Sequence, residues 1–303
     1  MSAVFSPKTE SFVISLFATA MRIAYLQFAP NYLAPEANRQ AAGRLLDRAF
    51  EKQGGADLVV LPELFTSGYF FRSSADVREA AEPVPEGPTT DWLAERASHT
   101  GAALVAGLPE RGADGALYNS AVVCSPGGFA GVYRKAHLYY EETLHFEPGR
   151  DGFPVFALET RDGMDYRLGV MVCFDWFFPE AARTLALKGA DVIAHPSNLV
   201  RPNCPRAMPI RALENRVFTI TANRTGRETN EREELAFIGQ SEICDPGGEL
   251  LARAGREEDA FGAAEIDPHD ARDKRVTAHN DLWNDRRPGG YVREAESRGH
   301  GAL

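Results

Sequence analysis

The stretch Leu168-Gly-Val-Met-Val-Cys-Phe-Asp-Trp176 decides the fold class of this chain. The part that ends at Val172 is a near-continuous apolar run rather than an alternating one, and such runs are typical of strands buried on both faces. A cysteine follows the run, and a helical stretch then begins after Pro179 and ends at Gly189. A buried strand, a turn and a helix in this order indicate an α/β layered domain.

The same alternation of short β-branched runs and helical stretches extends through most of the chain. Leu58-Val-Val-Leu61 is a second near-continuous apolar run, again typical of a buried strand. We expect strands at 22–28, 57–61, 102–107, 117–124, 130–134, 167–172, 190–195, 217–222 and 259–266. We expect helices at 37–53, 88–99, 178–188 and 206–216. Because neither a repeat nor a linker interrupts residues 21–275, the sequence predicts one continuous domain there.

Length and composition set the broad class of protein. The chain has 303 residues, 44% of them hydrophobic and 25% charged, which suits a globular protein with a sizeable core. The 33 basic and 43 acidic residues leave a formal net charge of −10. Because general nucleic-acid binding needs a basic face to replace counterions on phosphate, this charge argues against a nucleic-acid partner.

The four cysteines occur singly, at positions 124, 173, 204 and 244, and no Cys-x-x-Cys pair is present. A structural zinc site needs clustered thiolates or imidazoles, and a disulfide scaffold is short and cysteine-dense. The spacing fits neither. It indicates a reducing compartment with mostly inert buried thiols, or with one cysteine kept for chemistry.

The N-terminal end differs from the body. The run Phe12 to Ala20 resembles the core of a short signal peptide, but only Lys8 and the amino terminus supply positive charge before it. Met21 opens a strand-like run, as a natural start would. We therefore expect residues 1–20 to be an upstream start or an N-terminal extension, and the protein to be cytoplasmic.

The C-terminal end also lies outside the predicted domain. Residues 276–303 are expected to form a tail or dimer arm, because the part from 284 onward is rich in charge, Gly and Pro and can bury little. No apolar run in the chain approaches the roughly 20 residues of a membrane-spanning helix, so we expect no membrane partner.

Three polar residues each follow a predicted strand of this α/β domain: Glu63, Lys135 and Cys173. In α/β sheets, ligands bind beyond the carboxyl ends of strands, where side chains emerge from a rigid scaffold. Any single strand can end in a polar residue. A base, a cation and a thiol together are the parts of a covalent acyl-transfer site.

Four segments carry a resemblance to a known family. They are LPELFTSGY (61–69), YRKAHLYYEETLHFEPG (133–149), VMVCFDWFFPEAARTLALKGADVIAHPSNLV (170–200) and PRAMPIRALENRVFTITANRTG (205–226). Together they resemble the nitrilase, or carbon–nitrogen hydrolase, superfamily, from about Met21 to Pro288. The wording around Cys173 is similar to that of a microbial branch with archaeal nitrilases and small aliphatic amidases.

The resemblance implies a fold, a catalytic set and an assembly. The family's Glu-Lys-Cys triad falls on Glu63, Lys135 and Cys173, and a second family glutamate falls on Glu142 rather than on the adjacent Glu141. The implied fold is a four-layer αββα sandwich that dimerises into αββα–αββα, so the resemblance implies a homodimer or a higher homo-oligomer.

The chemistry of an amide or nitrile explains these residue types. A neutral thiol is a poor nucleophile, so Glu63 would take the proton of Cys173, and Lys135 would stabilise the developing negative charge. The backbone N–H of Phe174 is a second candidate donor to that charge. We expect Glu142 to orient Lys135 or to bind the substrate nitrogen.

Residues beside the nucleophile are the candidate pocket walls. These substrate-binding candidates are Phe174, Trp176, Phe177 and Asn198. Cys204, in a proline-flanked loop, is expected near the pocket without a catalytic role, whereas Cys124 and Cys244 are expected in the core. Structural hydrogen bonding or pocket lining suits the histidines at 137, 145 and 195 better than metal ligation. No metal or cofactor is expected, since neither a phosphate-binding loop nor a dinucleotide motif occurs.

The sequence leaves several substrates open. The leading prediction is hydrolysis of small amides, or nitriles, to a carboxylic acid and ammonia through a thioester acyl-enzyme. N-carbamoyl-amine or N-carbamoyl-amino-acid hydrolysis is the alternative, with Arg201 or Arg206 as candidate partners for a substrate carboxylate. Transfer of an acyl group or amide nitrogen to another acceptor is the alternative from a different class.

Overall fold

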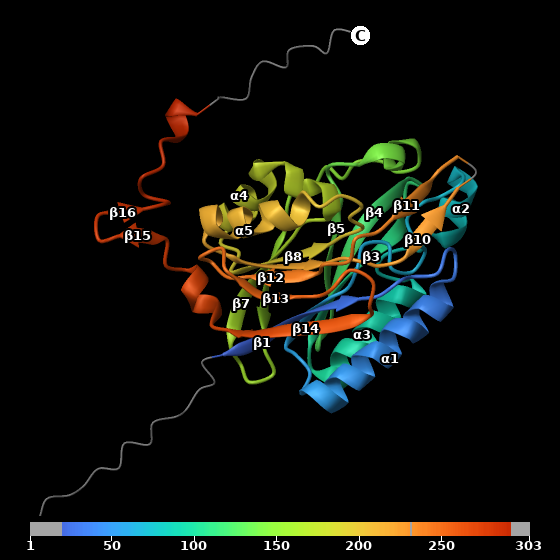
Figure 1. Ribbon diagram of the computed structural model, residues 1–303, viewed down its shortest axis with the longest axis horizontal. Helices are drawn as coiled ribbons and strands as arrows, with labels where there is room; N and C mark the ends of the chain where they lie inside the picture. Colours follow the sequence, from blue (N-terminus) through green and yellow to red (C-terminus); the bar gives the residue numbers. More distant parts are fainter. Residues whose placement is uncertain (1–19, 231, 292–303) are drawn as a thin grey trace, which may run out of the picture.

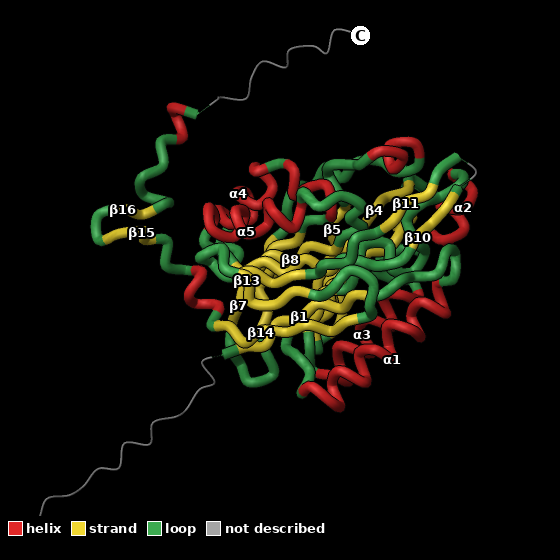
Figure 2. The backbone as a smooth tube through the Cα atoms, in the orientation of Figure 1, coloured by secondary structure: helices red, strands yellow, loops and turns green. Residues whose placement is uncertain are grey.

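A computed structural model describes residues 20–230 and 232–291 of the chain. These residues form two six-stranded sheets with helices on their outer sides (Figures 1 and 2). The N-terminal residues 1–19, for which an extension was predicted, lie outside the described part.

The first sheet has the strand order β14-β1-β2-β3-β4-β5. Its inner strands β1, β2 and β3 are parallel, and β4, β5 and β14 join them antiparallel. The strands are β1 (Met21–Gln27), β2 (Leu58–Val60), β3 (Ala103–Arg111), β4 (Leu117–Ser125), β5 (Gly128–Arg134) and β14 (Ala260–Ile266).

The second sheet repeats this plan with the order β13-β12-β9-β8-β7-β6. Strands β7, β8 and β9 are parallel, and β6, β12 and β13 complete the sheet antiparallel. The strands are β6 (Val155–Glu159), β7 (Asp165–Val170), β8 (Val192–Pro196), β9 (Phe218–Ala222), β12 (Glu242–Cys244) and β13 (Leu250–Arg253).

Two pairs of long helices flank the sheets. The pairs are α1 (Pro35–Gln53) with α3 (Pro88–Thr100), and α4 (Pro179–Leu187) with α5 (Cys204–Asn215). Each of these helices has a proline in its first turn, where the missing N–H would have no partner inside the helix. In Figure 1, α1 and α3 lie along one side of the sheets and α4 and α5 along the other.

The alternation of side chains along β1 explains why the layers pack. Ile23 and Tyr25 belong to the core that also contains Val170 of the second sheet. The intervening residues, such as Leu26, pack in a separate core with Leu46 of α1. A strand with successive side chains on opposite faces thus joins the sheet-to-sheet core to the sheet-to-helix core.

The remaining elements are short. They are α2 (Ser74–Ala80), the 3-10 helices η1 (Tyr140–Leu144), η2 (Cys173–Phe177), η3 (Pro268–Ala271) and η4 (Pro288–Gly290), the hairpin β10 (Arg227–Thr229) with β11 (Glu234–Ala236), and the hairpin β15 (Arg275–Thr277) with β16 (Asn280–Asp281). Both hairpins lie outside the two large sheets.

The α/β class is confirmed, and every strand and helix expected from the sequence overlaps an observed one. The prediction for Cys204 is wrong in one respect. It does not lie in a loop but is the first residue of α5 and is buried, because Pro205 fits the first turn of a helix instead of preventing one.

The described part of the C-terminal segment leaves the body of the molecule (Figure 1). It is anchored at Trp283, whose ring lies 5.1 Å from the guanidinium of Arg183 and 5.0 Å from Lys274 Nζ. Val276 and Tyr291 are exposed, and residues 292–303 lie outside the described part. Among the residues that can be described, no helix combines the length and apolar character needed to cross a bilayer.

Candidate active site

Cys173 lies at the tight turn between β7 and η2. Its φ of 41° falls in the left-handed region, which residues other than glycine seldom adopt and which is often found at functional sites. His195 of β8 holds the turn, since its Nε2 donates to the Cys173 carbonyl oxygen at 2.9 Å. Burial lowers the pKa of His195 to about 4, so this histidine is neutral and acts as a fixed hydrogen-bond donor.

Asp175 joins the same turn to the end of β5. Its Oδ2 accepts hydrogen bonds from the Val172 N–H and the Tyr133 hydroxyl, both at 2.8 Å. Its Oδ1 lies 2.7 Å from His137 Nδ1 and also accepts the His137 backbone N–H. Because Tyr133 and His137 flank Lys135, this carboxylate fixes the turn relative to that lysine.

Glu63 follows β2 at the carboxyl end of the parallel strands. The next residue, Leu64, has a φ of 47°. Gly107 of β3 makes room for this turn, because a Cβ there would lie 2.5 Å from Glu63 Cα and 2.6 Å from the Leu64 nitrogen. The Gly107 carbonyl also accepts a hydrogen bond from the Phe65 N–H at 2.9 Å. The backbone next to Glu63 is therefore fixed against β3.

Lys135 follows β5 and is fully buried. Its Nζ donates to Glu63 Oε1 at 2.7 Å and to Glu142 Oε1 at 2.7 Å. The two carboxylates are buried as well, so the three side chains form one water-poor group, here called the charged cluster.

Glu142 enters the charged cluster from η1. Tyr140, at the start of η1, has a φ of 53°, which turns the chain so that Glu142 points inward. Glu142 is 4% exposed, whereas Glu141 is only half-buried. The carboxylate of Glu142, rather than that of Glu141, therefore joins the charged cluster.

Two further residues hold the charged cluster in place, and sequence reasoning missed both. The Tyr69 hydroxyl donates to Glu142 Oε1 at 2.7 Å. Asn119 Nδ2 donates to Glu63 Oε1 at 2.7 Å. The signals were present, since Tyr69 ends the motif 61–69 and Asn119 is a carboxamide within the apolar run of β4.

Burial and mutual charge set the protonation states. Burial by itself would lower the pKa of Lys135, but Glu142 and Glu63 hold it above its usual value, so the lysine is a cation. Burial raises the pKa of Glu142 to about 7, although Lys135 opposes the shift. Burial, and then the charge of Glu63, raise the pKa of Cys173 well above that of a free thiol, so the resting sulfur keeps its proton.

The two oxygens of Glu63 differ in their partners. Oε1 accepts from Lys135 and Asn119, whereas Oε2 is buried and has no hydrogen-bond partner within the described residues. A buried carboxylate oxygen without a donor costs free energy and therefore calls for an explanation. The charge of Glu63 raises the pKa of Cys173, which indicates that the two side chains lie close together. The unpaired oxygen of Glu63 is therefore near a thiol that carries a proton.

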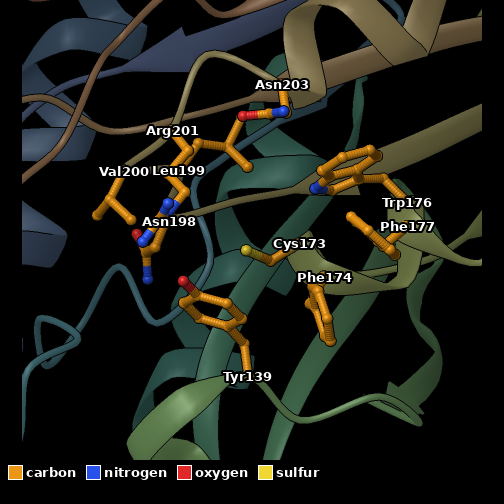
Figure 3. Close-up of a pocket in the computed structure, with 10 residues that line it drawn as sticks. All are labelled: Tyr139, Cys173, Phe174, Trp176, Phe177, Asn198, Leu199, Val200, Arg201 and Asn203. Carbon is orange, nitrogen blue, oxygen red and sulfur yellow. The ribbon is translucent and has the colours of Figure 1, made fainter.

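A cavity of about 250 Å³ adjoins the cysteine. Figure 3 shows the Cys173 sulfur directed toward Tyr139 and Asn198 and away from the rings of Phe174 and Trp176. Asn198 is 3% exposed, yet neither Oδ1 nor Nδ2 has a partner in the part of the chain that is described. The lining residues are Tyr139, Cys173, Phe174, Trp176, Phe177, Asn198, Leu199, Val200, Arg201 and Asn203.

Comparison with known proteins identifies the family of this chain. A family model described as carbon–nitrogen hydrolase matches residues 22–276. The chain belongs to this family. The predicted superfamily resemblance is therefore confirmed.

Individual relatives have related names. This carbon–nitrogen hydrolase is 52% identical over 273 residues to a protein named nitrilase from Pyrococcus abyssi, covering 90% of this chain and 100% of that one. It is 34% identical over 275 residues to an N-carbamoylputrescine amidase of Solanum lycopersicum, covering 84% of this chain and 88% of the relative. Among solved structures, a carbon–nitrogen hydrolase from Helicobacter pylori superposes with a TM-score of 0.80 at 29% identity, covering 90% and 97% of the two chains.

The structure of this hydrolase brings all four predicted wall residues, Phe174, Trp176, Phe177 and Asn198, to the cavity. Phe177 is 57% exposed and lies at the surface end of the lining. Sequence reasoning missed Tyr139 and the Leu199–Val200 pair. Of the two candidate arginines, Arg201 lines the cavity, whereas Arg206 and the predicted pocket neighbour Cys204 do not.

The other histidines of the hydrolase have structural contacts. His145 Nδ1 lies 3.0 Å from the Ser74 hydroxyl, and the ring of His137 stacks on Phe178 with a centroid distance of 3.7 Å. Across residues 20–230 and 232–291, no group of three or more His, Cys, Asp or Glu side chains is arranged to hold a metal ion.

Proposed function

We propose that this carbon–nitrogen hydrolase cleaves the nonpeptide C–N bond of small amides, with nitriles as a second substrate class, to a carboxylic acid and ammonia. The observation that carries the proposal is the buried lysine held between two carboxylates beside a protonated thiol. A nucleophile, a base and a cation in one water-poor site are the requirements of covalent acyl transfer.

Each member of the site has a separate role in the proposed reaction. The unpaired Oε2 of Glu63 takes the proton of Cys173 as the sulfur attacks the carbonyl carbon. The ammonium of Lys135 and the backbone N–H of Phe174 stabilise the oxyanion, and one such donor contributes ~3 kcal/mol, or about a hundredfold in rate. Glu142 holds the lysine in position.

The reaction then proceeds in two balanced stages. A C–S bond forms, Glu63 returns its proton to the nitrogen, and the C–N bond breaks to release ammonia and leave a thioester on Cys173. Water then gives a proton to Glu63 and attacks the thioester, which releases the acid and restores the thiol. With a nitrile, the first adduct is a thioimidate, and added water precedes the loss of ammonia.

Amides are proposed ahead of nitriles because of the residues that follow the cysteine in the sequence. The run Cys173-Phe-Asp-Trp176 lacks the Cys-x-Glu-Asn pattern of many dedicated nitrilases. The nitrilase name of the Pyrococcus abyssi relative supports nitriles as the second class. A cavity of about 250 Å³ supports small substrates in either case.

N-carbamoyl compounds are the second candidate. The relative named N-carbamoylputrescine amidase supports this class. Arg201 in the cavity lining would pair with a substrate carboxylate, which favours an N-carbamoyl amino acid over an N-carbamoyl amine. Transfer to another acceptor is the alternative from a different class, and it would release product only when that acceptor is present.

We also propose an assembly and a location. The two sheets with their helices would form a four-layer αββα sandwich that pairs through the α4–α5 side into αββα–αββα. Leu187, Ile210 and Leu213 on these helices are exposed apolar side chains, which supports a contact between copies there. All four cysteines are buried unpaired thiols, which suits the reducing cytoplasm.

An ammonia-release panel tests the proposed function. Wild type and Cys173→Ala are compared on short aliphatic amides, the matching nitriles and N-carbamoyl amino acids, each with and without an added amine acceptor. We expect acceptor-independent ammonia release from the amides by wild type alone. Equal release by the variant, or release that requires the acceptor, would contradict the proposal.

A further inference from the structure

A buried ion pair outside the cavity has no role in the reaction proposed above. Arg224, just after β9, and Glu228 of β10 are 1% and 8% exposed, and their side chains are in direct contact. The guanidinium also donates to the carbonyls of Thr225 and Pro30, at 3.1 and 3.2 Å. A buried ion pair adds little net stability over apolar residues of the same size, so its place in the fold calls for another explanation.

Glu228 holds the backbone of a distant segment. Its Oε2 accepts the N–H of Tyr69 at 2.9 Å and that of Phe70 at 2.7 Å. Gly68 permits this approach, because it has a φ of 77° and a Cβ there would lie 2.5 Å from Glu228 Oε1. One carboxylate thus fixes the segment that follows the proposed base, Glu63.

The same ion pair also supports the side chain of Tyr69. The guanidinium of Arg224 lies 4.0 Å from the centre of the Phe237 ring. The ring of Phe237 in turn meets the Tyr69 ring edge to face, with a centroid distance of 6.0 Å. The hydroxyl at the far end of Tyr69 donates to Glu142. Backbone and ring are both held, so the phenol has one available position.

We propose that the Arg224–Glu228 ion pair is a positioning device for the charged cluster, which fixes Tyr69 so that its hydroxyl keeps Glu142 a carboxylate bound to Lys135. This inference rests on the proposed function, because it assigns a purpose to residues that act on the same site. Tyr69, Arg224 and Glu228 are positioning residues here, since Tyr69 acts through Glu142 and the ion pair acts through Tyr69.

The groups that face Glu142 determine what the hydroxyl does. They are Lys135 after β5, Glu63 and Tyr69 after β2, and Cys173 at the start of η2, with the neutral Asn119 of β4. Burial favours the acid form and raises the pKa of Glu142 to about 7, whereas the phenol bonds more strongly to the carboxylate than to the neutral acid and so lowers the pKa. Loss of that donor raises the pKa of Glu142 further, so the carboxylate is lost at a higher pH.

Tyr69→Phe removes the hydroxyl and keeps the ring. We expect the acid limb of the kcat profile to move up by about one pH unit, since a hydrogen bond to a charged group is worth roughly that much in pKa. At pH 7 this lowers kcat several-fold. KM is expected to stay unchanged, because Tyr69 does not line the cavity.

The ion pair is tested by removing both charges together, in Arg224→Met/Glu228→Gln, so that no single charge is left buried. We expect the same upward shift of the acid limb as in Tyr69→Phe. Combining all three substitutions should give no further shift, because the ion pair acts through the tyrosine. Should the double variant fail to fold, Phe237→Leu loosens the contact between Arg224 and the Tyr69 ring without removing a charge. The same upward shift of the acid limb is then expected, and an unchanged acid limb would contradict the inference.

A matched control lies on the same hairpin. Arg227 and Glu234 form an exposed ion pair between β10 and β11, and Glu234→Gln should leave the pH profile unchanged. An unchanged acid limb in Tyr69→Phe, or additive effects in the triple variant, would overturn the inference. If Cys173→Ala retains activity, the proposed function fails first. If only the Tyr69 prediction fails, the proposed function stands.

Discussion

The two six-stranded sheets have the same plan and contribute different chemistry. Each has three parallel inner strands with antiparallel strands at its edges. The first sheet leads into Glu63 and Lys135, two of the three members of the charged cluster. The second sheet leads into Cys173 and Asn198, which line the cavity. The charges and the proposed nucleophile therefore meet only when the two sheets pack face to face.

The comparison also explains why the first sheet carries more supporting contacts. A buried charge needs an opposite charge or several hydrogen bonds, and Lys135 has both carboxylates, with Asn119 and Tyr69 behind them. A neutral thiol needs less support, and the turn at Cys173 is held through its backbone and Asp175. Substitutions on the two sheets should accordingly fail in different ways.

The largest effect is expected on the second sheet. Cys173→Ala should lower turnover by at least ~10⁴-fold, because the covalent route is lost, while the melting temperature changes little. Cys204→Ala is the matched control, since that thiol is also buried but does not line the cavity, and it should remain active. Appreciable turnover by the Cys173 variant in the ammonia-release assay would contradict the proposal that the second sheet supplies the nucleophile.

On the first sheet, Lys135→Met should affect activity and stability together. We expect a loss of ~10²–10³ in kcat from the missing cation. Lys135 opposes the rise in the pKa of Glu142, so without the lysine this folded-state pKa moves further above the unfolded value. Stability should then be greatest in acid and fall as the pH rises through that folded-state pKa.

Melting temperatures between pH 5 and 8 check this prediction. Lys188→Met, at the exposed end of α4, is the control and should leave both the kcat and the slope of stability with pH as in wild type. A Lys135 variant with the wild-type slope would show that the two carboxylates do not depend on the lysine.

Two glycines, one in each sheet, test the difference between the sheets with smaller expected losses of activity. Gly107→Ala in the first sheet drives a Cβ into the backbone of Glu63, so we expect a loss of ~1–3 kcal/mol in stability and about tenfold or more in kcat. Gly169→Ala in the second sheet meets only side chains, Leu185 and Ala190, at 3.1 Å. It should lower the melting temperature and spare kcat. Equal losses of kcat in the two glycine variants would contradict the expected difference between the two sheets.

The smallest effect on catalysis is expected at the C-terminal end. Deleting residues 276–303 should weaken self-association, measured by sedimentation, because the described part of this segment extends beside α4 with Val276 and Tyr291 exposed. Among the described residues of the segment, none lines the cavity, so kcat per subunit should stay unchanged. An unchanged oligomeric state would contradict a role of the segment in self-association, and the segment would then be a tail.

Local signals account for what the sequence could predict. Apolar runs and helix-opening prolines mark the buried strands and long helices, and the strand ends lead to Glu63, Lys135 and Cys173. Strand β13 was missed because it has only four residues, which are largely exposed and do not alternate between apolar and polar side chains. The contact of Glu228 with Tyr69 joins positions 159 residues apart, so nothing in either neighbourhood announces it.

The central claim is that Cys173 becomes acylated during turnover. Quenched-flow mass spectrometry of the wild-type chain with a small amide substrate tests it most directly, with peptide mapping to locate any adduct. The account predicts an acyl mass on Cys173 that forms within the first turnover and disappears when the substrate is exhausted. Turnover without an adduct, or an adduct on Cys204 instead, would contradict it.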